Sequence, residues 1–137
     1  MHFVLDSNAV IHVFNKSLRL SAEHSYFISI ITEIELLSFS KLTQEDIVET
    51  RKALSKFKRI HLTDPVKERT IQIRRMNKIK LPDCIIIASA LEEKATLITY
   101  DQQLINCQLV LNCIKKDRMF MTITHLNQLV TLNNKLP

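Results

Sequence analysis

Short apolar runs and amphipathic stretches alternate along this chain. The apolar runs are rich in Val, Ile, Leu and Phe, which is typical of strands that are buried in a sheet. The predicted strands are residues 2–5, 26–30, 59–62, 96–99 and 108–111. The predicted helices are residues 9–14, 33–37, 43–57, 64–76, 81–93 and 124–132. Strands that alternate with helices favour an α/β fold, in which helices cover both faces of a parallel sheet.

Polar residues stand where several predicted helices begin. Ser7 or Asn8 is expected to cap the first helix, since short polar side chains accept hydrogen bonds from free backbone N–H groups. Thr32 and Glu35 have the spacing of a capping box. Asp64 is expected to cap the helix that follows, with proline at its first position.

Composition indicates an ordinary globular protein. Of the 137 residues, 46% are hydrophobic and 24% are charged, and we expect a single domain over residues 1–137. The longest apolar runs are far shorter than the roughly 18 residues of a membrane span, and the N-terminus lacks the basic segment of a secretory signal. We therefore expect a cytoplasmic location and no membrane partner.

Glycine and cysteine usage excludes several classes of site. The sequence has no glycine, so neither a P-loop nor a Gly-rich dinucleotide-binding loop is possible. The three cysteines have no CxxC spacing, which argues against a disulfide framework and against a zinc site. A net charge of +5 favours an anionic partner such as nucleic acid.

Four acidic residues are expected at one edge of the predicted sheet. Asp6 ends the first strand and Asp101 follows the fourth, whereas Glu35 lies in the helix after the second strand. Asp83 begins the most apolar helix, which must start at the same edge in order to run antiparallel to the strands. Ligands of open parallel sheets bind beyond the carboxyl ends of the strands.

Four neighbouring carboxylates repel one another unless a cation compensates their charge. Oxygen ligands without His or Cys favour Mg²⁺ or Mn²⁺, and one or two such ions support phosphodiester hydrolysis. Each acid also has a simpler interpretation, as a helix cap or as a solvated residue. Glu33 is the rival of Glu35, and the helical period allows only one of the two to face the site.

Three segments together resemble PIN-domain nucleases, and specifically the VapC toxins of VapBC toxin–antitoxin pairs. The opening strand FVLDSNAVI, the acidic segment ISIITEIELLSF and the segment LPDCIIIASALEEKATLITYD match in order and spacing, and the resemblance spans residues 2–104. It selects Glu35 over Glu33, because the family glutamate falls three residues after the threonine. Tyr100 departs from the family pattern, in which a basic residue is common before the last aspartate.

The resemblance implies a fold, an activity and partners. The fold is a three-layer α/β/α sandwich with a parallel sheet of about five strands. The activity is that of an endoribonuclease that requires Mg²⁺ or Mn²⁺ and acts as a toxin on an RNA substrate. An antitoxin protein is expected to block the site and to bind promoter DNA only as a complex, and a homodimer is expected. The implied metal ligands and catalytic residues are Asp6, Glu35, Asp83 and Asp101, and Ser7, Asn8 and Thr99 are expected to orient them.

Basic residues are candidates for contacts with RNA phosphates, since each neutralised phosphate adds affinity. The cluster just before Asp83 is preferred, and it comprises Arg74, Arg75, Lys78 and Lys80. Most other basic residues are interpreted as a solvated helix face. Aromatic residues are few and are not interleaved with the basic runs, so no platform for stacking bases is expected.

Other functions fit the sequence less well. A PIN-like fold without activity, acting as an RNA-binding or assembly module, is the main alternative, and the presence of all four acids argues against it. A receiver domain needs a phosphoacceptor aspartate after the third strand, where the chain instead reads RIHLTDP. A haloacid-dehalogenase hydrolase needs a second acid or a threonine at position 8, which is Asn8.

Overall fold

A computed structural model describes residues 1–106 and 120–121. The elements are, in order, β1 (His2–Leu5), α1 (Ser7–Phe14), β2 (Ser25–Ser29), α2 (Ile30–Leu37), α3 (Gln44–Leu54), β3 (Lys58–Ile60), α4 (Asp64–Met76), α5 (Leu81–Glu92), β4 (Thr96–Ile98), α6 (Gln102–Asn106) and β5 (Phe120–Met121). The predicted alternation of strands and helices is therefore present.

The sheet is parallel throughout. Its strand order is β3-β2-β1-β4-β5, and each neighbouring pair runs in the same direction. Four of the strands are predicted ones, whereas β5 is a pairing of two residues only. The strand that was expected over 108–111 lies outside the described residues, as does the helix expected over 124–132. The single domain over 1–137 stays a prediction for the same reason.

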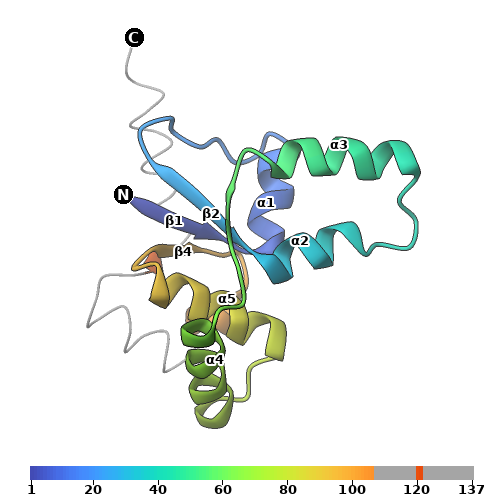
Figure 1. Ribbon diagram of the computed structural model, residues 1–137. Helices are drawn as coiled ribbons and strands as arrows, with labels where there is room; N and C mark the ends of the chain where they lie inside the picture. The colour runs from blue at the N-terminus through green and yellow to red at the C-terminus, as the bar shows by residue number, and fades with distance from the viewer. Residues whose placement is uncertain (107–119, 122–137) are drawn as a thin grey trace.

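Helices lie on both faces of the sheet (Figure 1), and each face packs in its own hydrophobic core. Successive side chains of a strand point to opposite faces. Val4 accordingly packs in the core that also holds α4 and α5, whereas Phe3 and Leu5 pack in the core that also holds α1. Leu54 of α3 belongs to this second core. The three-layer α/β/α arrangement is thereby confirmed.

The strand order of the sheet has a switch point between β1 and β4, because successive strands are added first on one side of β1 and then on the other. From β1 the chain adds β2 and then β3 on one side, and it returns after α4 and α5 to add β4 on the other side of β1. Such a switch point leaves a crevice at the carboxyl ends of the two strands, because the flanking helices diverge there. Asp6 follows β1 directly at this point.

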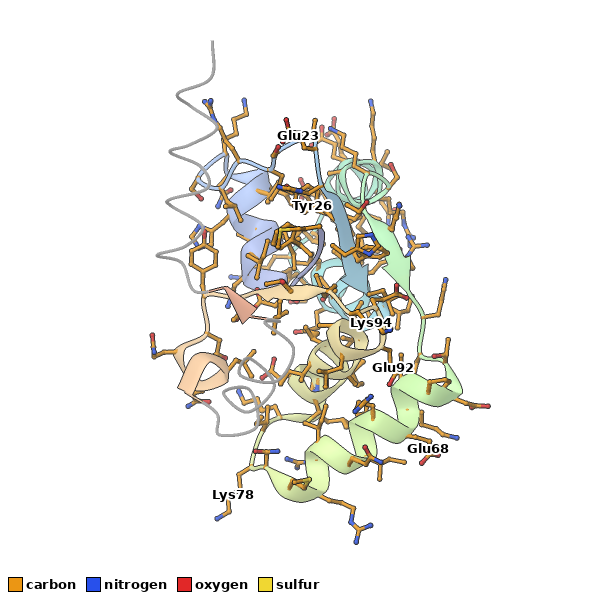
Figure 2. All side chains as sticks on the ribbon, turned by 90° about the vertical axis from the view of Figure 1, so that its left-hand side faces the viewer. Glu23, Tyr26, Glu68, Lys78, Glu92 and Lys94 are labelled. Atoms are coloured by element: carbon orange, nitrogen blue, oxygen red, sulfur yellow. The ribbon has the colours of Figure 1, made fainter. Side chains whose placement is uncertain are left out.

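The helix α5 is the most deeply buried helix among the described residues. Every residue from Cys84 to Ala90 is buried, because α5 lies between the sheet and α4. An ion pair at the surface joins the two helices, with 3.1 Å between Arg69 Nε and Glu92 Oε1. Figure 2 shows Glu92 near the end of α5, above the long α4. This packing explains the continuous apolar run of α5.

Three expected helix caps are wrong, because each helix begins earlier than the sequence suggested. Asp6, and not Ser7 or Asn8, caps α1. Ser29 caps α2, so Thr32 lies inside the helix, where its buried hydroxyl has no hydrogen-bond partner. Thr63 caps α4 in place of Asp64, which is the first residue of that helix.

No helix among the described residues has the length and apolar character to cross a membrane.

Candidate functional site

A cavity of about 450 Å³ lies where β1 and β4 end. Its lining residues are Asp6, Ser7, Asn8, Ile11, Glu35, Ser38, Phe39, Asp83, Ile86 and Asp101. The four predicted acids thus line one cavity, although they come from four separate parts of the chain. Asp6 ends β1 and Asp101 follows β4, while Glu35 lies in α2 and Asp83 lies in the first turn of α5.

Asp6 is held by hydrogen bonds to both of its carboxylate oxygens. The backbone N–H of Ala9 donates to Oδ1 at 2.8 Å, and the hydroxyl of Thr99 donates to Oδ2. The same hydroxyl accepts the backbone N–H of Asp101 at 3.0 Å. Thr99, which is buried, therefore connects the carboxylate of Asp6 to the backbone of Asp101.

Burial is the main cause of the raised pKa of Asp6, which is only 5% exposed. The bonds from Thr99 and Ala9 lower this pKa in part, the negative charge of Asp101 raises it further, and the nearby His12 lowers it slightly. The unfavourable burial of the charge is therefore only partly offset by the residues around it.

The other acids of the cavity repel one another. The pKa of Glu35 is raised by burial, then by the charges of Asp83 and Asp6. The pKa of Asp83 is also raised, by burial first and then by Asp101 and Asp6, while Lys80 lowers it. These mutual effects mean that the four carboxylates are close enough for the charge of one acid to raise the pKa of another.

Ser7 and Asn8 lie in the first turn of α1 and line the cavity, since Asp6 takes the cap position before them. The Ser7 hydroxyl oxygen is buried and has no hydrogen-bond partner of ordinary geometry, although it lies close enough to Glu35 to lower the pKa of that acid. A buried hydroxyl without a partner in a polar cavity is a position where a ligand or a water is expected to bind.

The spacing of the four carboxylates differs from that of the ligands of one ion. Among the residues that the structure describes, no three His, Cys, Asp or Glu side chains are grouped closely enough to hold a metal ion. No basic side chain is among the residues that line the cavity, so none of them compensates the four negative charges.

Glu33 faces away from the cavity. Its carboxylate forms an ion pair with Arg59 of β3, with 2.9 Å between Arg59 Nη2 and Glu33 Oε1. Because residues two apart on a helix point in different directions, this pair turns Glu35 toward the cavity. The geometry thus agrees with the choice of Glu35 over Glu33.

The predicted basic residues gather beside the cavity and do not line it. Arg74, Arg75, Lys78 and Lys80 line a separate hollow of about 590 Å³ in the connection from α4 to α5. Arg74 donates a hydrogen bond to the carbonyl of Ile79, and Lys80 lies near enough to Asp83 to lower its pKa. Figure 2 shows Lys78 pointing away from the body of the molecule.

The structure adds an aromatic contact that the sequence did not indicate. The rings of His12 and Tyr100 stack with their centroids 4.0 Å apart and their planes at 23°. His12 Nδ1 lies 2.8 Å from the Ser17 hydroxyl, which itself donates to the carbonyl of His12. The Ser17 hydroxyl thereby contacts both the ring and the backbone of His12. The stack joins α1 to the segment between Thr99 and Asp101.

Phe39 is a second residue that the sequence did not single out. It follows the end of α2, it is 57% exposed, and it lines the same cavity as the acids. No periodicity in the sequence indicated this position, because α2 ends at Leu37, before Phe39. Phe39, Ile11 and Ile86 are the apolar residues that line the cavity together with its carboxylates.

Comparison with known proteins gives one family and several related structures. Residues 3–107 match the family model described as PIN domain. A chain of a toxin–antitoxin complex from Klebsiella pneumoniae is similar, with 29% identity and a TM-score of 0.64 over 77% of this chain and 92% of that chain. No curated protein matches the chain.

Two more distant structures share the fold. One is VapBC2 from Rickettsia felis bound to a DNA fragment from its promoter, with 19% identity and a TM-score of 0.69 over 89% of this chain and 98% of that one. The other is VapBC-1 from nontypeable Haemophilus influenzae, with 18% identity and a TM-score of 0.67 over 90% of this chain and 99% of that one. The three-layer sandwich is therefore that of known PIN-like structures.

Proposed function

Because the chain belongs to the PIN domain family, we propose that it is a metal-dependent endoribonuclease that acts as the toxin of a toxin–antitoxin pair. One observation carries the proposal: Asp6, Glu35, Asp83 and Asp101 come from four separate parts of the chain and line one cavity at the switch point of the sheet. Acidic residues with only a structural role are not expected in one cavity, because their mutual repulsion disfavours the folded state.

The donor atoms of the cavity fit Mg²⁺ or Mn²⁺. All four charged side chains offer carboxylate oxygens, and the partnerless Ser7 hydroxyl adds a position for a bound water. The raised pKa values of Asp6, Glu35 and Asp83 mark negative charge that the protein itself does not compensate. When bound there, a divalent cation supplies activation of water and stabilisation of charge on a phosphodiester.

The residues of the chain prepare this site. Thr99 and the backbone of Ala9 hold the Asp6 carboxylate in one orientation, and the Thr99 hydroxyl also holds the backbone of Asp101. Ser7 and Asn8, at the edge of the same cavity, are assigned to orienting a carboxylate or a water. Arg74, Arg75, Lys78 and Lys80 are assigned to phosphates of the RNA on either side of the cleaved bond.

The proposed partners follow from the related structures. The structures from Klebsiella pneumoniae, Rickettsia felis and Haemophilus influenzae are toxin–antitoxin complexes or VapBC structures, and the second of them holds promoter DNA. We assign to this chain a cognate antitoxin, contact with promoter DNA only through that complex, and a homodimeric toxin in the cytoplasm. Co-purification with the product of a neighbouring reading frame is the simplest check.

The first experiment compares the wild type with Asp6→Asn and Asp83→Asn on total RNA in Mg²⁺, Mn²⁺ or EDTA. The matched control is Asp64→Asn, which removes an exposed aspartate far from the cavity. Cleavage is expected for the wild type and the control in the presence of metal, and loss of activity is expected for the two cavity variants with their folding intact. In EDTA no sample is expected to cleave.

Mn²⁺ binding by calorimetry separates this proposal from its alternative. An inactive RNA-binding or assembly module has no use for a metal and is expected to bind Mn²⁺ weakly or not at all. If no sample cleaves RNA and the wild type does not bind Mn²⁺, the nuclease proposal is wrong and the assembly module takes its place.

A further inference from the structure

Two buried hydroxyl groups lack a partner among the protein's own atoms. Among the residues that the structure describes, Ser7 Oγ and Thr32 Oγ1 are the only side-chain oxygen or nitrogen atoms that are buried without a hydrogen bond. Buried polar groups in folded proteins are nearly always paired, either with protein or with an ordered water. Ser7 lines the cavity, whereas Thr32 is 0% exposed and is not among the lining residues. The Thr32 hydroxyl therefore needs an explanation of its own.

Thr32 differs in this respect from other buried hydroxyl residues in helices. Thr70 and Ser89 each donate at 2.7 Å to the carbonyl four residues earlier in the same helix. The residue four positions before Thr32 is Ile28, which belongs to β2 and not to α2. Because α2 begins only two residues before Thr32, the usual acceptor within the helix is missing for its hydroxyl.

The position of Thr32 on α2 is between the cavity and a hydrophobic core. Residues three and four apart are neighbours on a helix surface, so Glu35 and Leu36 lie next to Thr32. Glu35 lines the cavity, and Leu36 packs in the core that also holds Ala9 and Val10 of α1. The helices α1 and α2 follow neighbouring strands and pack against each other (Figure 1). Thr32 therefore lies on the side of α2 that faces α1, next to Glu35.

Ser7 approaches the same carboxylate from the other helix. It is the first residue of α1, and its hydroxyl is close enough to Glu35 to lower the pKa of that acid in part. A buried water in a protein makes about three hydrogen bonds. Two hydroxyls and one carboxylate supply this number, since each hydroxyl can donate to the water and the water can donate to the carboxylate. One water thus satisfies both unpaired hydroxyls.

We propose that Thr32 is a positioning residue, which orients the carboxylate of Glu35 through one ordered water that it shares with Ser7. The inference rests on the proposed metal site and adds to it a residue that does not line the cavity. The water restricts the rotation of the Glu35 side chain before an ion binds. Less rotamer freedom is then lost on binding, so the affinity for the ion is higher.

The test compares Thr32→Val with Thr32→Ser by calorimetric titration with Mn²⁺ and by Tm in EDTA. Valine keeps the shape of the side chain but removes the hydroxyl, so Mn²⁺ affinity is expected to fall by about 10- to 100-fold and Tm is expected to fall. Serine keeps the hydroxyl and is expected to restore both. The matched control is Thr70→Val, which removes a buried helical hydroxyl outside the cavity. It is expected to lower Tm and to leave Mn²⁺ affinity unchanged.

A double-mutant cycle tests whether the two hydroxyls act through the same water. The cycle combines Thr32→Val with Ser7→Ala and measures Mn²⁺ affinity and Tm in EDTA for each single variant and for the double variant. Two groups that act independently give fold-changes that multiply. If they share one water, the first substitution already releases it, and the double variant is expected to bind Mn²⁺ as weakly as the weaker single variant does.

The outcomes separate the inference from the function on which it rests. If the wild type binds Mn²⁺ and Thr32→Val raises Tm without a change in affinity, the hydroxyl is truly unpaired and the inference is overturned. Fold-changes that multiply in the cycle overturn the shared water. If the wild type does not bind Mn²⁺, the proposed function fails, and the cycle on Tm in EDTA decides about the water by the same criterion.

Discussion

Asp6 has two functions in the structure because its two oxygens have different partners. Oδ1 caps α1 by accepting the N–H of Ala9, and Oδ2 accepts the hydroxyl of Thr99. A carboxylate oxygen has two lone pairs, so each atom keeps one for another partner. The capping interpretation and the metal-site interpretation of this residue are therefore compatible, and the cap fixes the carboxylate at the cavity edge.

The hydrogen bond from the Thr99 hydroxyl holds the Asp6 carboxylate in its orientation. Thr99→Val keeps the shape of the side chain but removes the donor to Asp6 and the acceptor for the N–H of Asp101. We expect Mn²⁺ affinity to fall by about 10- to 100-fold, which is the usual effect of losing a group that orients a ligand. Calorimetric titration of both proteins measures this change.

The control for this prediction is Thr70→Val. Thr70 is also a buried threonine with an intrahelical hydrogen bond, 2.7 Å from its hydroxyl to the carbonyl of Val66, but it lies on α4. It is expected to lose some stability and to keep its Mn²⁺ affinity. Equal loss of affinity in both variants would assign the effect to general destabilisation and contradict the role given to Thr99.

Charge repulsion in the cavity predicts a variant that is more stable than the wild type. The ionised form of Asp83 is disfavoured by burial and by the charges of Asp101 and Asp6, so Asp83→Asn removes a destabilising charge at neutral pH. In EDTA we expect Tm to rise by about 2–4 °C, which corresponds to ~1 kcal/mol, a modest value because Asp83 is partly solvated. Differential scanning calorimetry measures Tm.

Two comparisons check the cause. Asp64→Asn removes an exposed aspartate and is expected to change the stability by less than about 0.5 kcal/mol. In saturating Mn²⁺ the order reverses, and the wild type is expected to be more stable than Asp83→Asn because the variant lacks a ligand. A lower Tm for Asp83→Asn in EDTA would show that the carboxylate is stabilising by itself.

At the scale of elements, the connection from β4 to α6 depends on its contact with α1. Thr99 and Asp101 both lie in this connection, and Tyr100 between them stacks on His12 of α1. The backbone N–H of Gln103 donates to the Asp101 carboxylate at 2.8 Å, so the acid also begins the short helix α6. Asp101 is connected to Asp6 by the two hydrogen bonds of the Thr99 hydroxyl, and its segment is connected to α1 by the ring contact.

Removal of the ring contact is expected to loosen this connection. Tyr100→Ala should speed hydrogen exchange of the Asp101 amide, because the contact that holds its segment to α1 is lost. An aromatic pair contributes ~0.5–1.5 kcal/mol, which corresponds to an increase of about 2- to 13-fold in exchange rate. Tyr100→Phe keeps the ring and is expected to exchange as the wild type does, and an unchanged rate in the Ala variant would contradict the role of the stack.

At the scale of the whole molecule, the strand order places the acids together. Because the chain adds β4 on the opposite side of β1 from β2, the acid that follows β4 lies beside the acid that follows β1. The helix α5 begins at the same edge and brings Asp83 there. The two cores hold this arrangement, so the cavity is a consequence of the fold as a whole.

Stability of the whole chain is expected to depend on pH and on metal together. Asp6, Glu35 and Asp83 have pKa values above the ordinary 3.8 of Asp and 4.5 of Glu, so the folded state binds their protons more tightly than the unfolded state does. Their contribution to stability is complete below the unfolded values and is lost as the pH rises through the folded ones. The measurement compares, in EDTA, the Tm of the wild type with the Tm of a variant in which all three acids are neutralised. The difference, wild type minus variant, should increase as the pH falls from about 7 to about 4.

Mn²⁺ is expected to act in the opposite sense. At 100 times its Kd, a ligand that binds only the folded state stabilises it by ~2.7 kcal/mol. Protons compete for the same oxygens, so this stabilisation should shrink as the pH falls. Thermal unfolding at several pH values, with Mn²⁺ and with EDTA, measures both trends. A Tm that is independent of Mn²⁺ at neutral pH would contradict the metal site.

The sequence by itself determined the strands and helices from β1 to β4, the parallel direction of the sheet and the four acids of the cavity, whereas α6 and β5 were not predicted. Apolar periodicity was sufficient for the elements because each is stabilised by burial of one face or one run, as in the apolar residues of α5. The placement of Asp6, Glu35, Asp83 and Asp101 was predictable because the carboxyl ends of parallel strands meet at one edge.

Only the tertiary structure decided the contacts between distant residues. The pairing of Glu33 with Arg59, the stack of His12 on Tyr100 and the position of Phe39 in the cavity depend on how separate elements pack. Two of the three caps were mispredicted for a related reason, since α1 and α2 begin directly where the preceding strand ends, at Asp6 and Ser29. Local patterns carry the propensity of each segment, and the geometry between segments comes from packing the whole chain.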